Sequence, residues 1–563
     1  MRTSRRMLKQ IRRALFAAFL FSGCINVLML ATPLYTLQIF ESVVPLGSIE
    51  TLVLLTLMAG GAIAALALIE IARDNILLRA SLWLDHELGQ HILENGIKLG
   101  VPGSELRQDA AALERFRSYL AGGAIAPLFD APWIPIFMTT LFLLHPMIGA
   151  VALTSALMLV VAALSQSVLT SRLAQESATA HQRSEHWWMA VAGNTQLSGA
   201  LGLAKGASAQ WETFNRAHIA GSYSLGKRSS LIKAYSRSVR IGSQIGLYGV
   251  GAWLVVHGEV APGVLVASSI MLGRALAPLE QLVSSIKATQ GAFAAYRRLK
   301  ALPADAVVPR VQAAGDGVSG DLALNDVTFY HPGRKTPALR SINLKLKRGE
   351  CIGIVGSNGA GKSTLAGILA GAMAPATGSA ELDAIPIVKW QRGDTQPPIG
   401  YMPDDPVLIE GSVQDNIARF TGASLMSVAR AAMRAGVHDT LQSLAAGYDT
   451  QVGPGGSGLA LRERRAVALA RALHGEPRTI VLDEPEIGLD GTSMRRLISV
   501  LSDLKAEGIG LVLATQDPRF LALTDTILVL NAGAVQAFGP APDIKRQMAA
   551  HGSAATPERT AMQ

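Results

Sequence analysis

Nine consecutive residues have the types and the spacing needed to bind the phosphates of a nucleotide. They read Gly-Ser-Asn-Gly-Ala-Gly-Lys-Ser-Thr and contain the full Gly-x4-Gly-Lys-Ser motif. Glycines let the backbone curl so that its N–H groups point at phosphate oxygens, and the helix that follows adds the positive end of its dipole. We expect Lys362 to reach the β- and γ-phosphates and Ser363 to ligate Mg²⁺. The predicted ATP-binding residues are Gly356, Ser357, Asn358, Gly359, Ala360, Gly361, Lys362, Ser363 and Thr364.

A second motif, TIVLDEP at 479–485, supplies the acidic groups that this chemistry requires. Apolar residues lead to Asp483, which we expect to hold Mg²⁺ through water. Glu484 follows and is placed to orient or deprotonate the attacking water. The alternative is an ordinary buried strand that ends in a charged turn, and the nearby phosphate loop argues against it.

The elements around these motifs alternate between strand and helix. Strand patterns cover LALNDVTF (322–329) and INLKLK (342–347), and the apolar run ECIGIV enters the phosphate loop. These patterns predict an α/β P-loop nucleotide-binding domain over 321–545. We expect a linker rich in Ala, Pro and Gly at 301–320 and a disordered tail at 546–563.

The first 300 residues have a membrane composition. The chain has 563 residues, of which 49% are hydrophobic and 17% charged, and its mean hydropathy is +0.30, too apolar for an ordinary soluble enzyme. The segment TLVLLTLMAGGAIAALALIEIA (51–72) alone satisfies the requirement of ~20 apolar residues for crossing a bilayer. We predict a helical membrane domain over 1–300 with six spans, roughly 14–38, 50–72, 124–144, 147–168, 239–257 and 263–284.

Charge predicts how these spans are oriented. The stretch MRTSRRMLKQIRRA has six basic residues and no acidic one, which places the N-terminus in the cytoplasm. The proposed outer loops, near 41–49, 145–147 and 257–262, contain no Lys or Arg. The net charge of +9 is therefore explained by membrane ends, and we expect no nucleic-acid partner.

Several residues within the spans allow more than one interpretation. Phe21 to Cys24 resembles the end of a lipoprotein signal, but the apolar run continues past Cys24, which favours an uncleaved span. Arg274, Asp130 and Glu70 lie in or beside spans, where a charge faces a cavity, a partner helix or the membrane end. Cys24 and Cys351 lie far apart in sequence and make no disulfide framework.

These motifs resemble the ATP-binding cassette superfamily over nearly the whole chain. The segments NVLMLATPLYTLQIFESVVPLGSIETL, FDAPWIPIFMTTLFLLHPMIG and GRALAPLEQL are similar to type I secretion exporters of the protease-secreting kind. The resemblance implies a half-transporter of the bacterial inner membrane that dimerises and joins a periplasmic adaptor and an outer-membrane channel. Such exporters use ATP to move an unfolded polypeptide out of the cell. We expect no peptidase-like domain before the first span, as in that branch.

The resemblance also implies roles for residues that depart from the family pattern. Asp404 occupies the position of the glutamine that contacts Mg²⁺ and water, and Gln516 that of the switch histidine. Asp can still ligate the metal, and Gln can donate a hydrogen bond to the γ-phosphate but carries no positive charge. The aromatic that stacks on adenine corresponds to His331 or its neighbour Tyr330. Asp490 matches the family's D-loop aspartate.

The signature loop departs furthest. A family member has Leu-Ser-Gly-Gly-Gln where this chain has Leu459, Ala460, Leu461, Arg462 and Glu463. In the family this loop closes over ATP bound to the other protomer, and its glycines let the backbone approach the phosphate. Ala460 lacks the hydroxyl group, while Leu461 and Arg462 add bulk. Removing one preorganised donor typically costs ~10²–10³ in rate, so hydrolysis is expected to be weakened.

Three hypotheses follow. The first is an ATP-driven polypeptide exporter, as a homodimer or a heterodimer. The second is an ATP-binding subunit with weak turnover, which either pairs with a chain that has an intact signature loop or gates an assembly. The third is the same architecture with a lipid or small-molecule cargo.

Overall fold

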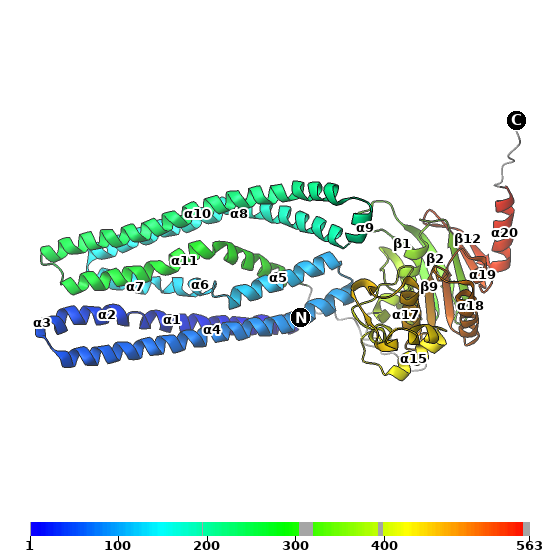
Figure 1. Cartoon of the computed structure of the whole chain (residues 1–563), viewed down its shortest axis with the longest axis horizontal. Coiled ribbons are helices and arrows are strands. Elements are labelled where there is room, and N and C mark those ends of the chain that lie inside the picture. The colour runs from blue at the N-terminus through cyan, green and yellow to red at the C-terminus, as the bar shows by residue number, and fades with distance from the viewer. Residues whose placement is uncertain (1, 194, 303–318, 392–397, 555–563) are drawn as a thin grey trace, which may run out of the picture. The chain divides into compact units, whose positions relative to one another are not determined.

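The chain divides into two compact units, residues 1–306 and 307–563. The computed structural model describes residues 2–193, 195–302, 319–391 and 398–554. The first unit is helical, and the second combines β-sheets with helices (Figure 1). The linker predicted at 301–320 falls mostly outside the described residues, between the end of helix α11 at Lys300 and the start of strand β1 at Leu322.

Long helices that run side by side build the first unit (Figure 1). Among the described residues, six helical segments are long and apolar enough to cross a membrane, and each overlaps one predicted span. They are Gln10–Leu46, Ile49–Leu99, Ala126–Leu144, Pro146–Ala192, Ala204–Val256 and Pro262–Lys300. The helices are α1 (Arg2–Leu28), α2 (Ala31–Gln38), α3 (Val44–Leu46), α4 (Ile49–Leu99), α5 (Gly103–Ala121), α6 (Ala126–Asp130), α7 (Ile134–Leu144), α8 (Pro146–Ala192), α9 (Thr195–Ala200), α10 (Ala204–Val256) and α11 (Pro262–Lys300).

Local signals set the turns between these helices. Gly47 adopts a left-handed φ of 62° after α3, and Ser48 then caps α4 by accepting the N–H of Thr51. Pro146 begins α8, where its missing N–H costs nothing, and the His145 side chain accepts the N–H of Met147. The hairpins between consecutive spans therefore follow from the sequence around each turn.

Two acidic residues in or beside the predicted spans, Glu70 and Asp130, pair with Arg73. Arg73 of α4 has a side chain only 6% exposed and lies 3.8 Å from Glu70 and 3.6 Å from Asp130 of α6. A buried guanidinium needs such partners, because an uncompensated charge in an apolar environment is costly. Glu70 and Asp130 therefore contact a charge on a neighbouring helix turn or helix, whereas Arg274 is exposed.

The second unit contains a parallel sheet with an antiparallel edge. Its strand order is β12-β11-β3-β10-β9-β6, and β12 alone runs antiparallel to its neighbour. A four-stranded antiparallel sheet has the order β2-β1-β4-β5. The strands are β1 (Leu322–Phe329), β2 (Leu339–Leu346), β3 (Cys351–Gly356), β4 (Thr377–Leu382), β5 (Ile385–Pro386), β6 (Ile399–Met402), β7 (Gly411–Ser412), β8 (Gln451–Val452), β9 (Thr479–Asp483), β10 (Gly510–Ala514), β11 (Thr526–Asn531) and β12 (Ala534–Pro540).

The central strands bury both faces. Leu511 and Leu513 of β10 pack into a core with helices α15, α17 and α18, while Val512 and Ala514 pack into a second core with the antiparallel sheet and α12. The helices of this unit are α12 (Lys362–Leu369), α13 (Ile387–Gln391), α14 (Val413–Ile417), α15 (Leu425–Arg434), α16 (His438–Gln442), α17 (Leu461–Leu473), α18 (Gly491–Ala506), α19 (Pro518–Leu521) and α20 (Ala541–Ala554).

The tail predicted to be disordered from residue 546 begins within helix α20. Helix α20 continues to Ala554 because its first turns are anchored, with Ala541 and Ile544 buried against Val355 and Ile527. The remaining tail residues, 555–563, lie outside the described residues.

Candidate functional site

The parallel sheet brings the predicted site residues to one edge. Strands β3, β9 and β10 are neighbours and run in the same direction, so their carboxyl ends lie together. Gly356 ends β3 and begins the phosphate loop, Asp483 ends β9, and Gln516 follows β10 by two residues. Parallel sheets bind ligands at this edge, as the sequence motifs require.

The side chain of Lys362 folds back and contacts the phosphate loop. The ammonium of Lys362 is buried, and its Nζ donates to the carbonyl oxygens of Gly356 at 3.1 Å and Ser357 at 3.5 Å. Gly361 precedes α12 with a φ of 105°, and a Cβ there would lie 2.8 Å from Leu339 Cδ2. The eight-residue helix α12 therefore begins directly behind the loop, with its N-terminal N–H groups available to an anion.

A polar cavity of about 580 Å³ opens in front of this loop. Two arginines line it that the sequence motifs did not identify, Arg334 and Arg340. Both lie in the stretch HPGRKTPALR, whose clustered basic residues are the signal that was available in the sequence. The wall consists of His331, Arg334, Thr336, Pro337, Ala338, Arg340, Asn358, Gly359, Gly361, Lys362, Ser363, Thr364, Glu484, Ala532 and Gly533.

Asp483 has the surroundings of a metal ligand. It is 0% exposed, and neither carboxylate oxygen has a well-aligned hydrogen bond among the described residues. Burial raises the pKa of Asp483 to about 6, the neighbouring Ser363 hydroxyl partly opposes this rise, and the negative charges of Asp404 and Glu484 act in the same direction as burial. Buried charges are normally paired or coordinated to a metal, so a divalent cation such as Mg²⁺ fits this carboxylate and the adjacent Ser363 hydroxyl.

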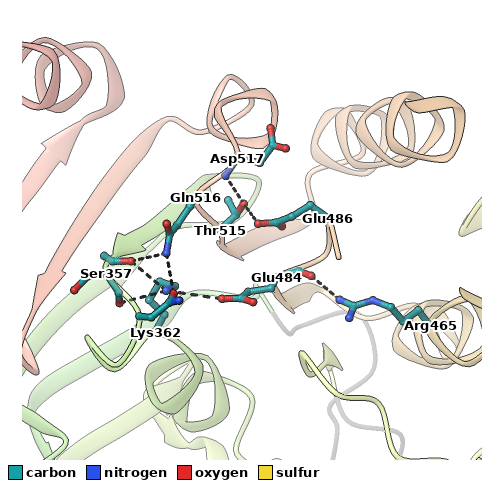
Figure 2. A network of polar contacts seen from close by, with 10 residues as sticks. Ser357, Lys362, Arg465, Glu484, Glu486, Thr515, Gln516 and Asp517 are labelled. Atoms are coloured by element: carbon teal, nitrogen blue, oxygen red, sulfur yellow. Dashed lines mark hydrogen bonds and ion pairs between the residues drawn. The ribbon is translucent and has the colours of Figure 1, made fainter. Parts of the chain in front are cut away.

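Glu484 is held in an unusual backbone conformation beside the lysine. Its φ is 46°, in the left-handed region that side chains disfavour, and its N–H donates to the carbonyl of Ala514 at 2.8 Å. Its carboxylate lies 3.8 Å from Lys362 Nζ and is 29% exposed. Figure 2 shows the carboxylate pointing toward Lys362 from the far side of the site. The group therefore faces the position that the terminal phosphate would occupy.

The segment after β10 contacts both motifs. Gln516 Nε2 donates to the carbonyl of Gly356 at 2.9 Å and to Asn358 Oδ1 at 3.3 Å. Thr515 is buried and donates its hydroxyl to Glu486 at 2.7 Å (Figure 2). Gln516 is thus placed at the phosphate loop, where an amide N–H can reach a bound phosphate.

Asp404 influences the site through the electrostatic effect of its charge on Asp483. It follows β6 by two residues, and its charge raises the pKa of Asp483. Its own side chain accepts the N–H of Asp405 at 2.9 Å, and its carbonyl accepts from Arg465 at 2.7 Å. Asp404 does not line the cavity wall, and one of its two carboxylate oxygens accepts the N–H of Asp405.

The structure separates the two candidates for the aromatic position. His331 lines the cavity, and its Nε2 lies 3.3 Å from the hydroxyl of Thr364. Its ring packs edge-on against Phe329, with centroids 5.2 Å apart. Tyr330 is 43% exposed and is not part of the wall. Of the two, His331 is therefore the residue placed to meet a base.

Leu459 to Glu463 form the entry to α17. Ala460 precedes the helix, and its N–H donates to the Glu463 carboxylate at 2.7 Å. Arg462 lies 3.3 Å from Asp490 and donates to the Ser493 hydroxyl at 3.2 Å. The backbone N–H of Ser493 lowers the pKa of Asp490, with a smaller contribution from Arg462. The first turn of α17 is thus occupied by interactions within the chain.

Comparison with known proteins identifies relatives of both units. The ABC transporter family model matches residues 339–486. The type I secretion system ATP-binding protein PrsD of Rhizobium meliloti is 30% identical over 555 residues, which cover 96% of this chain and 94% of PrsD. The alpha-hemolysin translocation ATP-binding protein HlyB of Escherichia coli O157:H7 is 27% identical over 87% of this chain and 71% of its own length.

A solved structure shows the same fold over the whole chain. A bacterial Atm1-family ABC exporter with ATP bound superposes with a TM-score of 0.80, covering 98% of this chain and 99% of that chain. The two sequences are only 20% identical, so this likeness concerns the fold alone. The six-helix unit and the nucleotide-binding unit described above are therefore the parts of an exporter fold.

Proposed function

Because this chain belongs to the family of ABC exporters related to type I secretion ATP-binding proteins, we propose that it uses ATP to export a polypeptide across a bacterial inner membrane. The observation that carries this proposal is the extent of the similarity to PrsD, which covers the membrane unit as well as the ATP-binding unit. A nucleotide-binding domain alone resembles many transporters, whereas the membrane unit is the part that contacts the cargo.

The residues at the sheet edge support binding and hydrolysis of ATP with Mg²⁺. Gly356 to Thr364 hold the phosphates, and Lys362 exchanges its carbonyl contacts for phosphate oxygens. Asp483, Ser363 and Asp404 would hold Mg²⁺, which neutralises phosphate charge when bound. Glu484 orients the attacking water and accepts its proton, and Gln516 donates to the γ-phosphate. His331, with Tyr330 beside it, contacts the adenine.

We also propose the assembly in which this occurs. The chain acts as a half-transporter that dimerises and joins a periplasmic adaptor and an outer-membrane channel, with a polypeptide as cargo. Its N-terminus and nucleotide-binding unit lie in the cytoplasm, in agreement with the six basic residues before the first span and the even number of spans.

One observation favours a second function, that of a weakened ATP-binding subunit in a heterodimer or a nucleotide-gated assembly. The Glu463 carboxylate occupies the N–H of Ala460 and brings negative charge to the start of α17. Arg462 pairs with Asp490, and both side chains remain exposed. A partner's phosphate would therefore meet a first turn whose donor is already used, with a like charge beside it.

Steady-state ATP hydrolysis by the purified chain in lipid separates the two functions. Glu484→Gln provides the background rate. Turnover clearly above this background supports a self-sufficient exporter, whereas ATP binding without turnover supports the weakened subunit. In the second case, a partner chain is sought by co-purification, and recovery of the chain alone contradicts the heterodimer.

Export is tested in the host cell. We expect cells carrying Glu484→Gln to lose at least one secreted polypeptide that cells with the native chain release. An unchanged set of secreted polypeptides, together with a changed lipid or small-molecule content of the medium, would contradict a polypeptide cargo.

A further inference from the structure

Arg465 is a buried charged residue for which the sequence motifs suggest no role. It lies in the second turn of α17 and is only 3% exposed. Its Nη1 donates to the carbonyl oxygen of Asp404 at 2.7 Å, and its Nη2 donates to that of Glu484 at 2.5 Å. Figure 2 shows the guanidinium reaching from α17 to the Glu484 backbone. One side chain thus joins two loops that are 80 residues apart in the sequence.

The choice of carbonyl acceptors has a chemical consequence. Arg465 lies in the field of four carboxylates, those of Glu486, Asp404, Glu484 and Asp405, all of which favour its charged form. Burial opposes them and lowers the pKa of Arg465, but a guanidinium stays protonated in proteins. Because its two nitrogens donate to carbonyls, the carboxylates of Asp404 and Glu484 remain available for a metal, water or Lys362.

The contact with Glu484 also stabilises a disfavoured conformation. The left-handed φ of 46° persists only where surrounding contacts hold it. The N–H of Glu484 donates to Ala514, and its carbonyl accepts from Arg465, so both peptide groups of the residue are fixed. This arrangement directs the carboxylate toward Lys362.

We propose that Arg465 is a positioning residue that holds Glu484 and the Asp404 loop in one geometry and ties both to α17. Residues Leu459–Glu463 begin the same helix one turn earlier. A displacement of that turn by a partner's nucleotide is therefore transmitted through Arg465 to the acidic groups of this chain's own site. This inference rests on the proposed ATP site, but it concerns contacts that exist in the nucleotide-free chain.

Hydrogen exchange of the full-length chain in lipid nanodiscs tests the contacts directly. In Arg465→Met, the side chain keeps much of its volume but loses its donors, and we expect exchange at 403–409 and 484–490 to rise about tenfold through local opening. Exchange over β3 and α12 stays unchanged. Arg471→Met is the matched control for 484–490, because Arg471 lies on the same helix and donates to the carbonyl of Val407 in the first loop at 3.2 Å, away from Glu484.

A second readout separates positioning from general support of the fold. ATP affinity is measured by displacement of a fluorescent analogue, once with a chelator and once with Mg²⁺. We expect Arg465→Met to keep the metal-free affinity, which depends on the phosphate loop, and to lose about tenfold of the gain that Mg²⁺ provides. Arg465→Lys, which keeps the charge and can reach one carbonyl, should fall between Met and the native chain.

The outcomes are distinguishable. Unchanged exchange in both loops, or an equal loss of metal-free and Mg²⁺-dependent affinity, overturns the positioning role. The same exchange increase at 484–490 in Arg471→Met also overturns it, because the effect would then belong to the helix as a whole. A native chain that binds no ATP contradicts the proposed function, whereas the exchange comparison still tests Arg465.

Discussion

At the scale of single residues, the proposed roles distinguish groups that hold ATP from the group that acts on it. Lys362 and the phosphate loop belong to the first set, and Glu484 belongs to the second. The two side chains meet in one ion pair at 3.8 Å, yet Lys362 begins α12 and Glu484 follows β9, so each can be changed independently. Substitution of Lys362 should therefore affect ATP binding, whereas substitution of Glu484 should affect the rate of ATP hydrolysis.

We expect Glu484→Gln to bind ATP as tightly as the native chain but to hydrolyse it at least about 100-fold more slowly. The amide keeps the shape of the side chain but cannot accept a proton. Lys362→Ala should instead weaken ATP binding, because the phosphates lose their buried cation. Analogue displacement and phosphate release measure the two quantities. A Glu484→Gln chain with the native rate would place the base elsewhere.

A second residue-scale prediction concerns the start of α17. The triple change Ala460→Ser, Leu461→Gly and Arg462→Gly should raise ATP turnover at least about tenfold in a chain that pairs with itself. It restores a hydroxyl donor and lets the backbone approach the partner's phosphate. Loss of the exposed Arg462–Asp490 pair costs little, since such pairs contribute ~0–1 kcal/mol. Unchanged turnover would show that this turn does not limit hydrolysis.

The buried carboxyl of Asp483 predicts a pH dependence of stability. Its pKa rises from 3.8 to about 6 on folding, so the folded state favours the protonated form and loses stability as pH rises through this window. Asp483→Asn should therefore stabilise the metal-free chain at pH 7.5, by up to about 3 kcal/mol, and have little effect near pH 4. Chemical unfolding in the presence of a chelator measures the difference. Equal effects at both pH values would show that Asp483 is not buried as a charge.

At the scale of elements, the close packing of α17 on β6 sets the position of Arg465. Gly400 lies in β6, and a Cβ there would collide with the carbonyl oxygen of Ala472 at the C-terminal end of α17. The strand continues to Met402, two residues before Asp404. This contact therefore fixes the spacing between the helix and the loop that Arg465 joins.

We expect Gly400→Ala to destabilise the nucleotide-binding unit by about 1–3 kcal/mol, the usual cost of overpacking. Gly491→Ala is the control, because it begins α18 and an added Cβ comes no closer than 3.9 Å to Arg495. Thermal unfolding of both full-length variants measures the effect. Equal stability of the two variants would show that β6 can move away from α17 without cost.

At the scale of the whole molecule, we expect the six spans to place the N-terminus and the nucleotide-binding unit on the same side of the membrane. This expectation rests on the six apolar helical segments, since an even number of spans returns the chain to the side on which it began. The basic N-terminus indicates that this side is the cytoplasm. An odd number of spans would put the nucleotide site outside the cell, where ATP is scarce. Topology is therefore a condition for the proposed function.

Introduced cysteines test this topology. In a Cys24→Ser background, Leu46→Cys lies at the end of α3 and Ser208→Cys lies near the start of α10, both at exposed positions. The remaining Cys351 is buried. We expect a membrane-impermeant maleimide to label Leu46→Cys in intact spheroplasts and Ser208→Cys only after permeabilisation. Labelling of Ser208→Cys from outside would invert the orientation.

The sequence by itself determined the spans and the nucleotide-binding motifs. A span is defined by length and hydropathy, and the phosphate loop is defined by residues that are consecutive in the chain, so both are local patterns. The strand LALNDVTF coincides with β1, and TIVLD coincides with β9. The anchoring of α20 is not local in this sense, because it depends on contacts of Ala541 and Ile544 with distant strands.

Only the tertiary structure decided which side chains meet. In the structure, His331 rather than Tyr330 lines the cavity, together with Arg334 and Arg340. The structure also showed Arg465 joining the carbonyls of Asp404 and Glu484, a contact between residues 61 and 19 positions apart. The sequence does not indicate which backbone carbonyl accepts a hydrogen bond, because every residue has a carbonyl. Their pairing is decided by how the helix packs on the sheet, which the local pattern of residues does not encode.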